Sequence, residues 1–388
     1  MSFPVIGIIG SGTMGSGIAQ VAATFNHKVI LYDSNIESLK KGIQLIENSL
    51  NRFVEKNKLT DNEYKSILNN ILIADSIADL KNSDLILEAI IEDEDSKKKL
   101  YSKIEEIVSP NAVLASNTSS FSIEKLSSNL KIKNRFLGMH FFNPPVLMEL
   151  VEIIFTSETD KNITDKVKEL ILSWKKIPVI VKDTSGFLVN RIARSFYLEA
   201  LKILEEKIAD IETVDWAMKK FGNFKMGPFE LMDLIGIDVN FSVTESVYKS
   251  FNNNARFRPS GLQKKMVQNN LLGKKTGIGF YDYKNPEIKK TDFNNIDLGN
   301  KIFTRIISML VNEAYFALQE KIATYNDIEL AMQKGANYPK GLLNWGKEIG
   351  YKNIINILNN LETKNKDDRY KVCPLILELE KTENKNDS

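Results

Sequence analysis

The strongest constraint on the fold lies in the first 25 residues, where a glycine-rich turn joins two apolar segments. Pro4–Ile9 is a continuous apolar run, typical of a buried strand, and Gly10–Gly15 (GSGTMG) follows it directly. Met14–Phe25 then carries small and apolar residues at helical spacing. Such a turn directs the N–H groups at the start of a helix toward a negatively charged group. The pattern predicts a parallel α/β domain with an anion-binding turn.

Apolar runs and helical patterns alternate up to about residue 183, as in a Rossmann-type α/β domain with a largely parallel sheet. Further strands are predicted at Lys28–Asp33, Leu85–Ile90, Val113–Ser116, Phe136–His140, Leu150–Ile154 and Pro178–Val181. Helices are predicted at Ile36–Lys56 and Asp160–Trp174, and Thr60 with Glu63 forms a capping box that opens another. Long amphipathic patterns then replace the strands, so we predict a domain boundary after residue 183.

The helical half contains an internal repeat. Three charged positions recur with unchanged spacing, since Arg191, Glu199 and Glu206 return as Arg305, Glu313 and Glu320. The tetrapeptide Glu-Lys-Ile-Ala also recurs, as do two glycines. Chance similarity between helices would repeat hydrophobicity alone. We therefore predict a duplicated all-α domain, with copy 1 at 184–296 and copy 2 at 297–388. Gly273–Tyr283 (GKKTGIGFYDY) has no counterpart in copy 2, and the polar stretch Lys284–Asn300 is the predicted linker.

Composition excludes several classes of partner. Lys and Arg number 52 and Asp and Glu 50, so the chain lacks the basic field that a nucleic-acid partner requires. No apolar stretch approaches the roughly 18 residues of a membrane span. The lone cysteine, Cys373, cannot form an intrachain disulfide, which fits a reducing compartment, and we expect a cytoplasmic protein. No metal site is assigned.

The end of the second predicted strand carries an acidic residue, Asp33. An acid at this point of a glycine-turn motif accepts hydrogen bonds from the adenosine ribose hydroxyls of a dinucleotide. Asp33 would repel a 2′-phosphate, and Ser34 and Asn35 supply no cation to bind one, so NAD is favoured over NADP. The residues expected to bind this cofactor are Gly10, Gly12, Thr13, Met14, Gly15 and Asp33.

Two histidines are present, and only one lies where a ligand is expected. His27 begins a strand and is interpreted as structural. His140 ends the strand Phe136–His140, and the carboxyl ends of parallel strands face the ligand. Glu152 lies in an apolar run where a free carboxylate would be costly to bury, so we expect a partner such as a protonated histidine. A structural His140 and a water-facing Glu152 on an edge strand remain open.

Together these motifs resemble the L-3-hydroxyacyl-CoA dehydrogenase family, and within it the 3-hydroxybutyryl-CoA dehydrogenases. The resemblance rests on the glycine turn, Asp33, the run HFFNP at His140 with Glu152 beyond it, Ser116–Ser120 (SNTSS), Gly186–Arg191 (GFLVNR) and Gly273–Tyr283. It implies a Rossmann domain followed by two helical repeats of the 6-phosphogluconate dehydrogenase C-terminal type. The implied activity is NAD-dependent oxidation of (S)-3-hydroxyacyl-CoA to 3-ketoacyl-CoA in fatty-acid or short-chain acyl-CoA metabolism.

The resemblance also implies roles for single residues. His140 would take the proton of the 3-hydroxyl while hydride leaves C3, and Glu152 would orient the imidazole. Ser119 and Asn190 would donate hydrogen bonds to substrate oxygens. The cofactor would also be contacted by Glu92, Lys97, Ser119 and Asn143, and coenzyme A by Ser49, Lys56 and Ser119, flanked by Arg52 and Lys58. Without the resemblance, capping roles and an exposed charged helix face would explain most of these residues.

Two other functions remain open at this point, a sugar-acid dehydrogenase of the gulonate type and an inactive NAD-binding scaffold. The chain has no room for a fused enoyl-CoA hydratase module. The expected partner is an acyl-CoA thioester, and the helical repeat predicts either a homodimer or a pseudo-dimer within one chain. The acyl chain length, including dicarboxylic substrates such as 3-hydroxyadipyl-CoA, and the physiological direction remain undetermined by the sequence.

Overall fold

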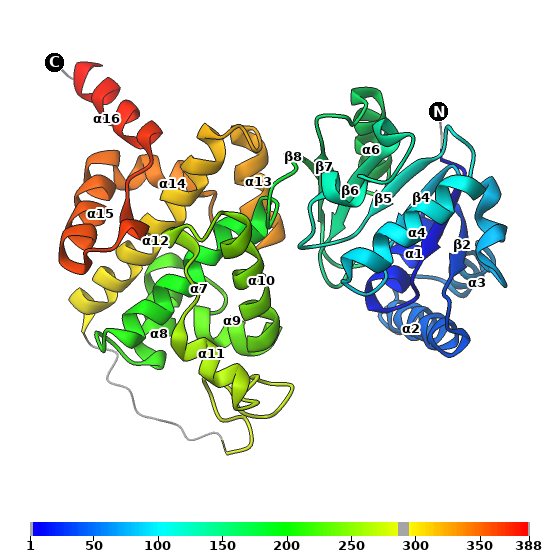
Figure 1. The fold of residues 1–388 in the computed structure, drawn as a ribbon. Helices are drawn as coiled ribbons and strands as arrows, with labels where there is room; N and C mark the ends of the chain where they lie inside the picture. The colour runs from blue at the N-terminus through cyan, green and yellow to red at the C-terminus, as the bar shows by residue number, and fades with distance from the viewer. Residues whose placement is uncertain (1–2, 286–294, 387–388) are drawn as a thin grey trace. The chain divides into compact units, whose positions relative to one another are not determined.

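The computed structural model describes residues 3–285 and 295–386 (Figure 1). The chain divides into two compact units, Met1–Phe187 and Leu188–Ser388. Unit 1 runs from blue to green in Figure 1, and unit 2 from green to red. In the described residues, no helix combines the length and the apolar character that crossing a bilayer requires.

Unit 1 is built on an eight-stranded sheet in its described residues, with the strand order β3-β2-β1-β4-β5-β6-β7-β8. The strands are β1 Val5–Ile9, β2 Lys28–Tyr32, β3 Ile71–Ile73, β4 Leu85–Glu88, β5 Val113–Ser116, β6 Phe136–Phe141, β7 Leu150–Phe155 and β8 Ile177–Lys182. Neighbours run parallel except β6 and β7, which are antiparallel. The chain passes from β1 outward to β2 and then crosses to β4 on the other side, so the strand order reverses at β1 and β4, where such sheets bind ligands.

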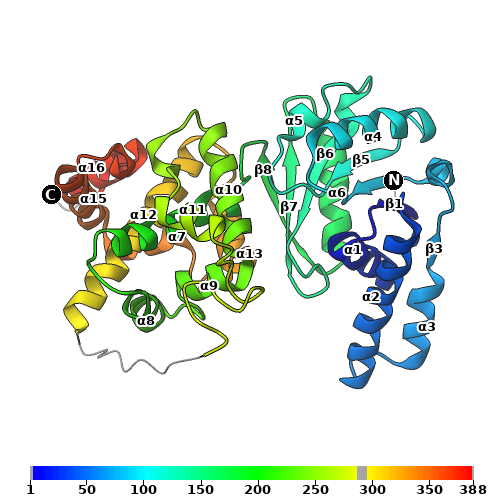
Figure 2. The ribbon, with the colours of Figure 1, turned by 60° about the horizontal axis from the view of Figure 1, so that its bottom comes forward.

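The helices of unit 1 connect successive strands. They are α1 Thr13–Thr24, α2 Ile36–Glu55, α3 Asp61–Asn69, α4 Glu94–Ile107, α5 Ile123–Leu126 and α6 Lys161–Ser173, with 3₁₀ turns η1 Ile77–Asn82 and η2 Lys133–Arg135. Thr60 caps α3 and forms the predicted capping box with Glu63. Helices α2 and α3 lie side by side (Figure 2). Ile8 and Ile9 of β1 point to opposite faces of the sheet, and both are buried, because helices cover both faces of a parallel sheet.

The predicted strands occur close to their expected positions, with one omission. Strand β3 has three residues, two of them exposed, so it lacks the apolar run from which the other strands were predicted. Strand β4 ends at Glu88, two residues before the predicted end, and this places Glu88 at the carboxyl edge of the sheet.

Unit 2 is helical throughout its regular structure in the described residues. Its first half comprises α7 Val189–Glu205, α8 Ile211–Gly222, α9 Pro228–Ile235, α10 Ile237–Ser250, η3 Ala255–Phe257 and α11 Gly261–Gln268. Its second half comprises α12 Ile296–Gln319, α13 Tyr325–Gly335, α14 Leu342–Ile349, α15 Tyr351–Asn365, η4 Asp368–Tyr370 and α16 Pro374–Asn386. The two halves therefore repeat one order of elements. Within the predicted linker, residues 286–294 lie outside the described residues, and α12 already begins at Ile296, so the end of that stretch is helical.

Helices α7 and α12 pack against each other and carry reciprocal ion pairs between the two copies. Arg191 Nε donates to Glu313 Oε1 at 2.7 Å, and Arg305 Nε donates to Glu199 Oε1 at 2.5 Å. The second nitrogen of each arginine binds the next glutamate of the opposite copy, since Arg191 binds Glu320 at 2.7 Å and Arg305 binds Glu206 at 2.9 Å. The second half of unit 2 thus packs on the first half through α7 and α12.

Candidate active site

The glycine turn between β1 and α1 leaves room for a phosphate group. Gly10 has φ +100°, and a side chain there would meet the carbonyl of Ala89 at 2.5 Å. Gly15 packs against the carbonyl of Gly10, so a larger residue would push α1 away from β1. Around Gly12, by contrast, the space is open, and no side chain caps α1 at this N-cap residue. The turn therefore fits the pyrophosphate of a dinucleotide.

Asp33 follows β2 and is fixed against the glycine turn. Its Oδ2 accepts hydrogen bonds from Ser11 N and Ser11 Oγ, both at 2.8 Å, and its Oδ1 accepts one from Asn35 N at 2.9 Å. The contact with Ser11 was not predicted from the sequence. It holds the carboxylate beside the turn, where a ribose attached to a bound pyrophosphate would lie.

His140 and Glu152 form a close pair in unit 1. They lie directly opposite each other on the antiparallel strands β6 and β7, and His140 Nδ1 is 2.6 Å from Glu152 Oε2. Glu152 is fully buried and His140 is 5% exposed. Phe142 and Phe187 lie against the imidazole, with ring centroids 4.6 and 5.6 Å away. Because the carboxylate holds Nδ1, Nε2 is the nitrogen placed for proton transfer with a ligand.

Glu92 organises the SNTSS loop after β5. Its Oε1 accepts hydrogen bonds from Thr118 Oγ1 at 2.7 Å, Ser119 N at 2.8 Å and Ser120 Oγ at 3.1 Å. Its Oε2 pairs with Lys97 Nζ at 3.0 Å. Burial acts to raise the pKa of Glu92, but the charge of Lys97 and these hydrogen bonds outweigh it and lower the pKa below its usual value. Glu92 thus stays ionised and fixes Ser119.

Lys97 is buried, with 1% of its surface exposed, and its ammonium lies between two carboxylates. Beyond Glu92, it donates to Glu88 Oε1 at 2.5 Å. Glu88 also accepts from Ser116 Oγ at 2.7 Å and Tyr101 OH at 3.1 Å. This enclosure favours a role for Lys97 in positioning Glu92 over direct contact with a cofactor. Glu88 was missed from the sequence, although a carboxylate ending a buried strand is the signal that could have indicated it.

The remaining cofactor-side candidate, Asn143, is exposed in the connection after β6. The SNTSS loop is joined to β6 by Asn117, whose Oδ1 accepts a hydrogen bond from Phe141 N at 2.8 Å. The loops after β5 and β6 are therefore tied together at the carboxyl edge of the sheet.

The candidate coenzyme A residues line a cavity of about 330 Å³ in unit 1. Ser49, Arg52 and Lys56 come from the end of α2, and Lys58 follows it. Residues 144–147 after His140 and the start of α1 also line this cavity. Three cations therefore border a hollow that also reaches the glycine turn, as the phosphates of coenzyme A would require.

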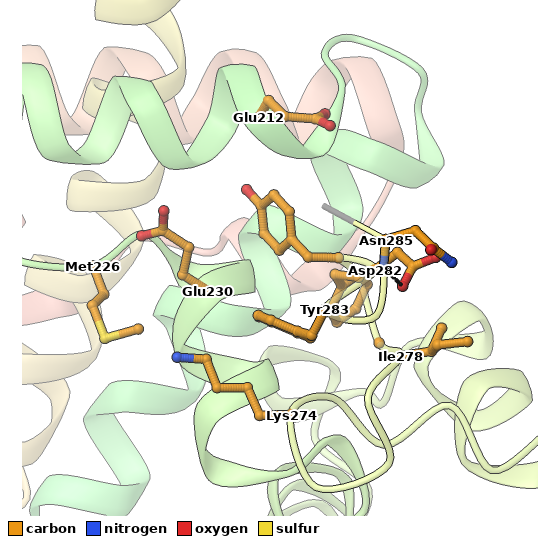
Figure 3. A pocket seen from close by; sticks show the side chains of 11 residues that line it. Glu212, Met226, Glu230, Lys274, Ile278, Asp282, Tyr283 and Asn285 are labelled. Carbon is orange, nitrogen blue, oxygen red and sulfur yellow. Dashed lines mark hydrogen bonds between the residues drawn. The ribbon is translucent and has the colours of Figure 1, made fainter. Parts of the chain in front are cut away.

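In unit 2, Asn190 lies in the first turn of α7 and is partly buried. A separate cavity of about 1020 Å³ lies under the segment Gly273–Tyr283, and Figure 3 shows Glu212, Glu230 and Lys274 along it. The hydroxyl of Tyr281, which also lines this cavity, donates to Asp215 at 2.8 Å. None of the candidate site residues lines this cavity, which the sequence did not predict.

Comparison with known proteins identifies the family. The model of the 3-hydroxyacyl-CoA dehydrogenase NAD-binding domain matches residues 5–184, and the model of the C-terminal domain of the same family matches twice, at 186–283 and 302–387. The chain is 34% identical to a 3-hydroxyadipyl-CoA dehydrogenase of Escherichia coli (strain K12) over 96% of each chain. It is 40% identical to a 3-hydroxybutyryl-CoA dehydrogenase of Clostridioides difficile, over 72% of this chain and 99% of the relative.

A solved structure agrees over the whole chain. A crystal structure described as 3-hydroxybutyryl-CoA dehydrogenase from Escherichia coli K12 has a TM-score of 0.94 and 33% identity, with all of both chains covered.

The glycine turn, Asp33 and the histidine–carboxylate pair define an NAD-dependent oxidoreductase with a Rossmann-type domain and a helical domain. The chain belongs to the 3-hydroxyacyl-CoA dehydrogenase family, and its activity is the NAD-dependent oxidation of 3-hydroxyacyl-CoA. The predicted fold class, cofactor and reaction class are confirmed.

Proposed function

We propose that this enzyme interconverts (S)-3-hydroxyacyl-CoA and 3-ketoacyl-CoA through a His140–Glu152 dyad. The observation that carries the proposal is the 2.6 Å contact between His140 Nδ1 and Glu152 Oε2. His140 Nε2 removes the proton of the 3-hydroxyl in the oxidative direction and returns it to the 3-oxygen in the reductive direction. Glu152 stabilises the imidazolium, which is the form of His140 after it takes the hydroxyl proton and before it returns one to the 3-oxygen. When bound, NAD supplies the hydride acceptor.

The surrounding residues place the substrate and exclude water. Phe142 and Phe187 give the imidazole an apolar environment, in which the ion pair with Glu152 is strengthened. Ser119, held by Glu92, and Asn190 of α7 donate hydrogen bonds to substrate oxygens. Lys97 acts on the site through Glu92.

Binding of the larger groups follows from the geometry of unit 1. The open space at Gly12, the amides of Thr13 and Met14, and Asp33 support NAD at the glycine turn, with Asn143 near the nicotinamide. In this proposal, coenzyme A binds at the cavity that Ser49 and Lys56 line, with its phosphates near the cations, and the lining of that cavity supports it. Cys373, whose thiol is buried, is consistent with a cytoplasmic enzyme.

The test is NADH oxidation with acetoacetyl-CoA at neutral pH for the wild type and His140→Gln. We expect kcat to fall by about 10³-fold in the variant, with NADH affinity retained, because the base is lost while the glycine turn is intact. His27→Gln is the matched control, since His27 Nδ1 only contacts the backbone oxygen of Phe3. Tight NADH binding without turnover of any 3-ketoacyl-CoA would refute the proposal and direct the search to sugar acids.

We also propose that the internal pairing of α7 with α12 replaces a partner subunit, so that the enzyme acts as a single chain. The reciprocal ion pairs of Arg191 with Glu313 and of Arg305 with Glu199 support this, because they join the two helices within one chain. Sedimentation should give a mass near 44.0 kDa. A mass near twice that value would show that a second chain is still needed.

A further inference from the structure

Arg194 is a buried cation with no charged partner. It lies one turn after Asn190 on α7 and is 3% exposed. The described residues contain four other buried arginines, each paired with a carboxylate, namely Arg135 with Glu105, Arg191 with Glu313, Arg305 with Glu199 and Arg369 with Asp367. Arg194 forms no ion pair with any residue in 3–285 or 295–386. Burying a cation without an anion is costly, so its retention requires an explanation.

The hydrogen bonds of Arg194 reach only neutral groups. Its Nε donates to the carbonyl of Asn190 at 3.0 Å, and its Nη1 donates to the carbonyl of Asn240 at 3.0 Å and to Thr244 Oγ1 at 3.2 Å. Its Cζ lies 4.9 Å from the ring of Tyr197. Burial lowers the pKa of Arg194, but a guanidinium does not lose its proton in proteins. These contacts orient the group beside Asn190 and leave its charge uncompensated.

Two more buried polar groups near Arg194 have no hydrogen-bond partner within the described residues. They are the hydroxyl of Tyr338, a residue 5% exposed, and Nδ2 of Asn240, a residue 1% exposed. Tyr338 lies near enough to influence the pKa of Arg194, and the main-chain carbonyl of Asn240 accepts a hydrogen bond from Arg194 Nη1. Gln263 Nε2 donates to Asn240 Oδ1 at 2.9 Å and to Met232 Sδ at 3.7 Å, and these two contacts assign Nδ2 as the free donor of Asn240. Unsatisfied buried donors around one cation point to an anionic ligand.

Copy 2 shows that the helical scaffold does not need this cation. In the repeat that aligns Arg191 with Arg305, Thr304 occupies the position of Asn190 and Ser308 that of Arg194. Ser308 is fully buried, and its Oγ donates to the carbonyl of Thr304 at 2.7 Å within its own helix. The cation is therefore present only in the copy that carries Asn190.

We propose that Arg194, together with Tyr338 and Asn240, binds a carboxylate at the far end of the acyl chain. The enzyme then prefers 3-hydroxyacyl-CoA substrates whose acyl group is dicarboxylic. This rests on the proposed function, in which Asn190 contacts the substrate, because Arg194 is held to the backbone of Asn190. A planar guanidinium binds both oxygens of a carboxylate, and the phenol and amide groups donate to the same oxygens. The methyl end of a monocarboxylic chain would leave the charge of Arg194 uncompensated and the two donors of Tyr338 and Asn240 without a partner.

The test compares 3-ketoadipyl-CoA with 3-ketohexanoyl-CoA, which have the same chain length and differ only at the terminal carbon. We expect the wild type to favour the dicarboxylic thioester in kcat/KM by roughly 100-fold, because a site built for a charged group rejects an analogue that lacks it. In Arg194→Met this ratio should fall to near unity, mainly through an increased KM for 3-ketoadipyl-CoA.

Two further variants separate recognition from folding. Tyr338→Phe removes one hydroxyl without changing the packing, and the ratio should fall by roughly 10-fold. Lys265→Met is the charge-matched control, since Lys265 is exposed on α11, and its ratio should equal that of the wild type.

The outcomes distinguish this proposal from the one on which it rests. Wild-type turnover of 3-ketohexanoyl-CoA that equals or exceeds that of 3-ketoadipyl-CoA overturns the carboxylate site and leaves the dehydrogenase assignment intact. Equal losses on both thioesters in Arg194→Met and Tyr338→Phe also overturn it, because the cluster would then be structural. Turnover of neither thioester by NADH-bound wild type would refute the proposed function, and the carboxylate site with it.

Discussion

Copy 1 and copy 2 of the helical repeat stabilise their helices with the same contacts. In copy 1, Asp215 accepts hydrogen bonds from the N–H groups of Phe229 and Glu230 at the start of α9, both at 2.9 Å. In copy 2, Glu329 does the same for Leu343 and Asn344 at the start of α14, at 2.7 and 3.3 Å. Each carboxylate lies against a glycine, Asp215 against Gly227 and Glu329 against Gly341. Any side chain at these glycines would collide with the carboxylate.

The two copies differ at three polar positions of copy 1, Asn190, Arg194 and Asp233. Asn190 and Arg194 correspond to Thr304 and Ser308 in copy 2, as described above. Asp233 of α9 accepts hydrogen bonds from Phe280 N and Tyr281 N, both at 2.9 Å, and so holds the segment that copy 2 lacks. The corresponding residue in copy 2 is Lys347, beside the ring of Tyr325. Positions shared by the copies thus maintain the pair, whereas Asn190 and Arg194, which we propose to contact the substrate, occur in copy 1 alone.

The largest expected effect is on stability, when one or the other of the reciprocal ion pairs is broken. We expect the two losses to be unequal. Arg305→Met leaves Glu199 buried with only the hydroxyl of Tyr370 at 3.0 Å, and should lower the free energy of unfolding by about 3–5 kcal/mol. Arg191→Met should cost less, by about 1 kcal/mol, because Glu313 keeps Arg256 at 3.0 Å. Denaturant unfolding of both variants measures the difference. Equal losses would show that Arg256 contributes nothing and that the two pairs are equivalent.

A second comparison tests Asn190 of copy 1 and Thr304, which occupies the same position in copy 2. Asn190→Ala should lower kcat/KM for a 3-ketoacyl-CoA by about 100-fold, because a donor to a substrate oxygen is lost. Thr304→Ala should leave kcat/KM unchanged, since Thr304 Oγ1 donates within its own helix, to the carbonyls of Asn300 at 2.8 Å and Lys301 at 3.2 Å. Steady-state kinetics with both variants checks this, and a comparable loss in Thr304→Ala would contradict a catalytically silent copy 2.

The smallest effect concerns pH. Burial raises the pKa of Asp215 to about 7, against the hydrogen bonds from Phe229, Tyr281 and Glu230. The native state therefore keeps a proton that the unfolded state releases near pH 4, and the free energy of unfolding falls as pH rises from about 4 to about 7. Asp215→Asn, which cannot ionise, should reduce this slope by about 1 kcal/mol per pH unit.

The measurement for Asp215 is urea unfolding at several pH values between 4 and 7. Burial also raises the pKa of Glu329, so Glu329→Gln should change the slope in the same sense. If Asp215→Asn has the same slope as the wild type, Asp215 is ionised throughout, and its hydrogen bonds dominate over burial.

Several site features could be predicted because they depend on local pattern. The glycine turn needs a strand, glycines at three positions and a helix, and all of these are contiguous in Pro4–Phe25. The positions of His140 and Glu152 followed from strand patterns, but their contact depends on the register of β6 and β7. The pairing of Lys97 could not be predicted from the sequence, because only the fold brings Glu88 and Glu92 around its ammonium.

By itself, the sequence determined the class of fold, the cofactor, the reaction and the existence of a repeat, because each is encoded by short motifs or by matching spacing. The tertiary structure decided which groups meet. Arg191 pairs with Glu313 of the other copy, not with Glu199 of its own helix, and Arg194 has no carboxylate within reach among the described residues. Charge and apolar character are properties of single residues, whereas burial and pairing arise only when distant segments pack together.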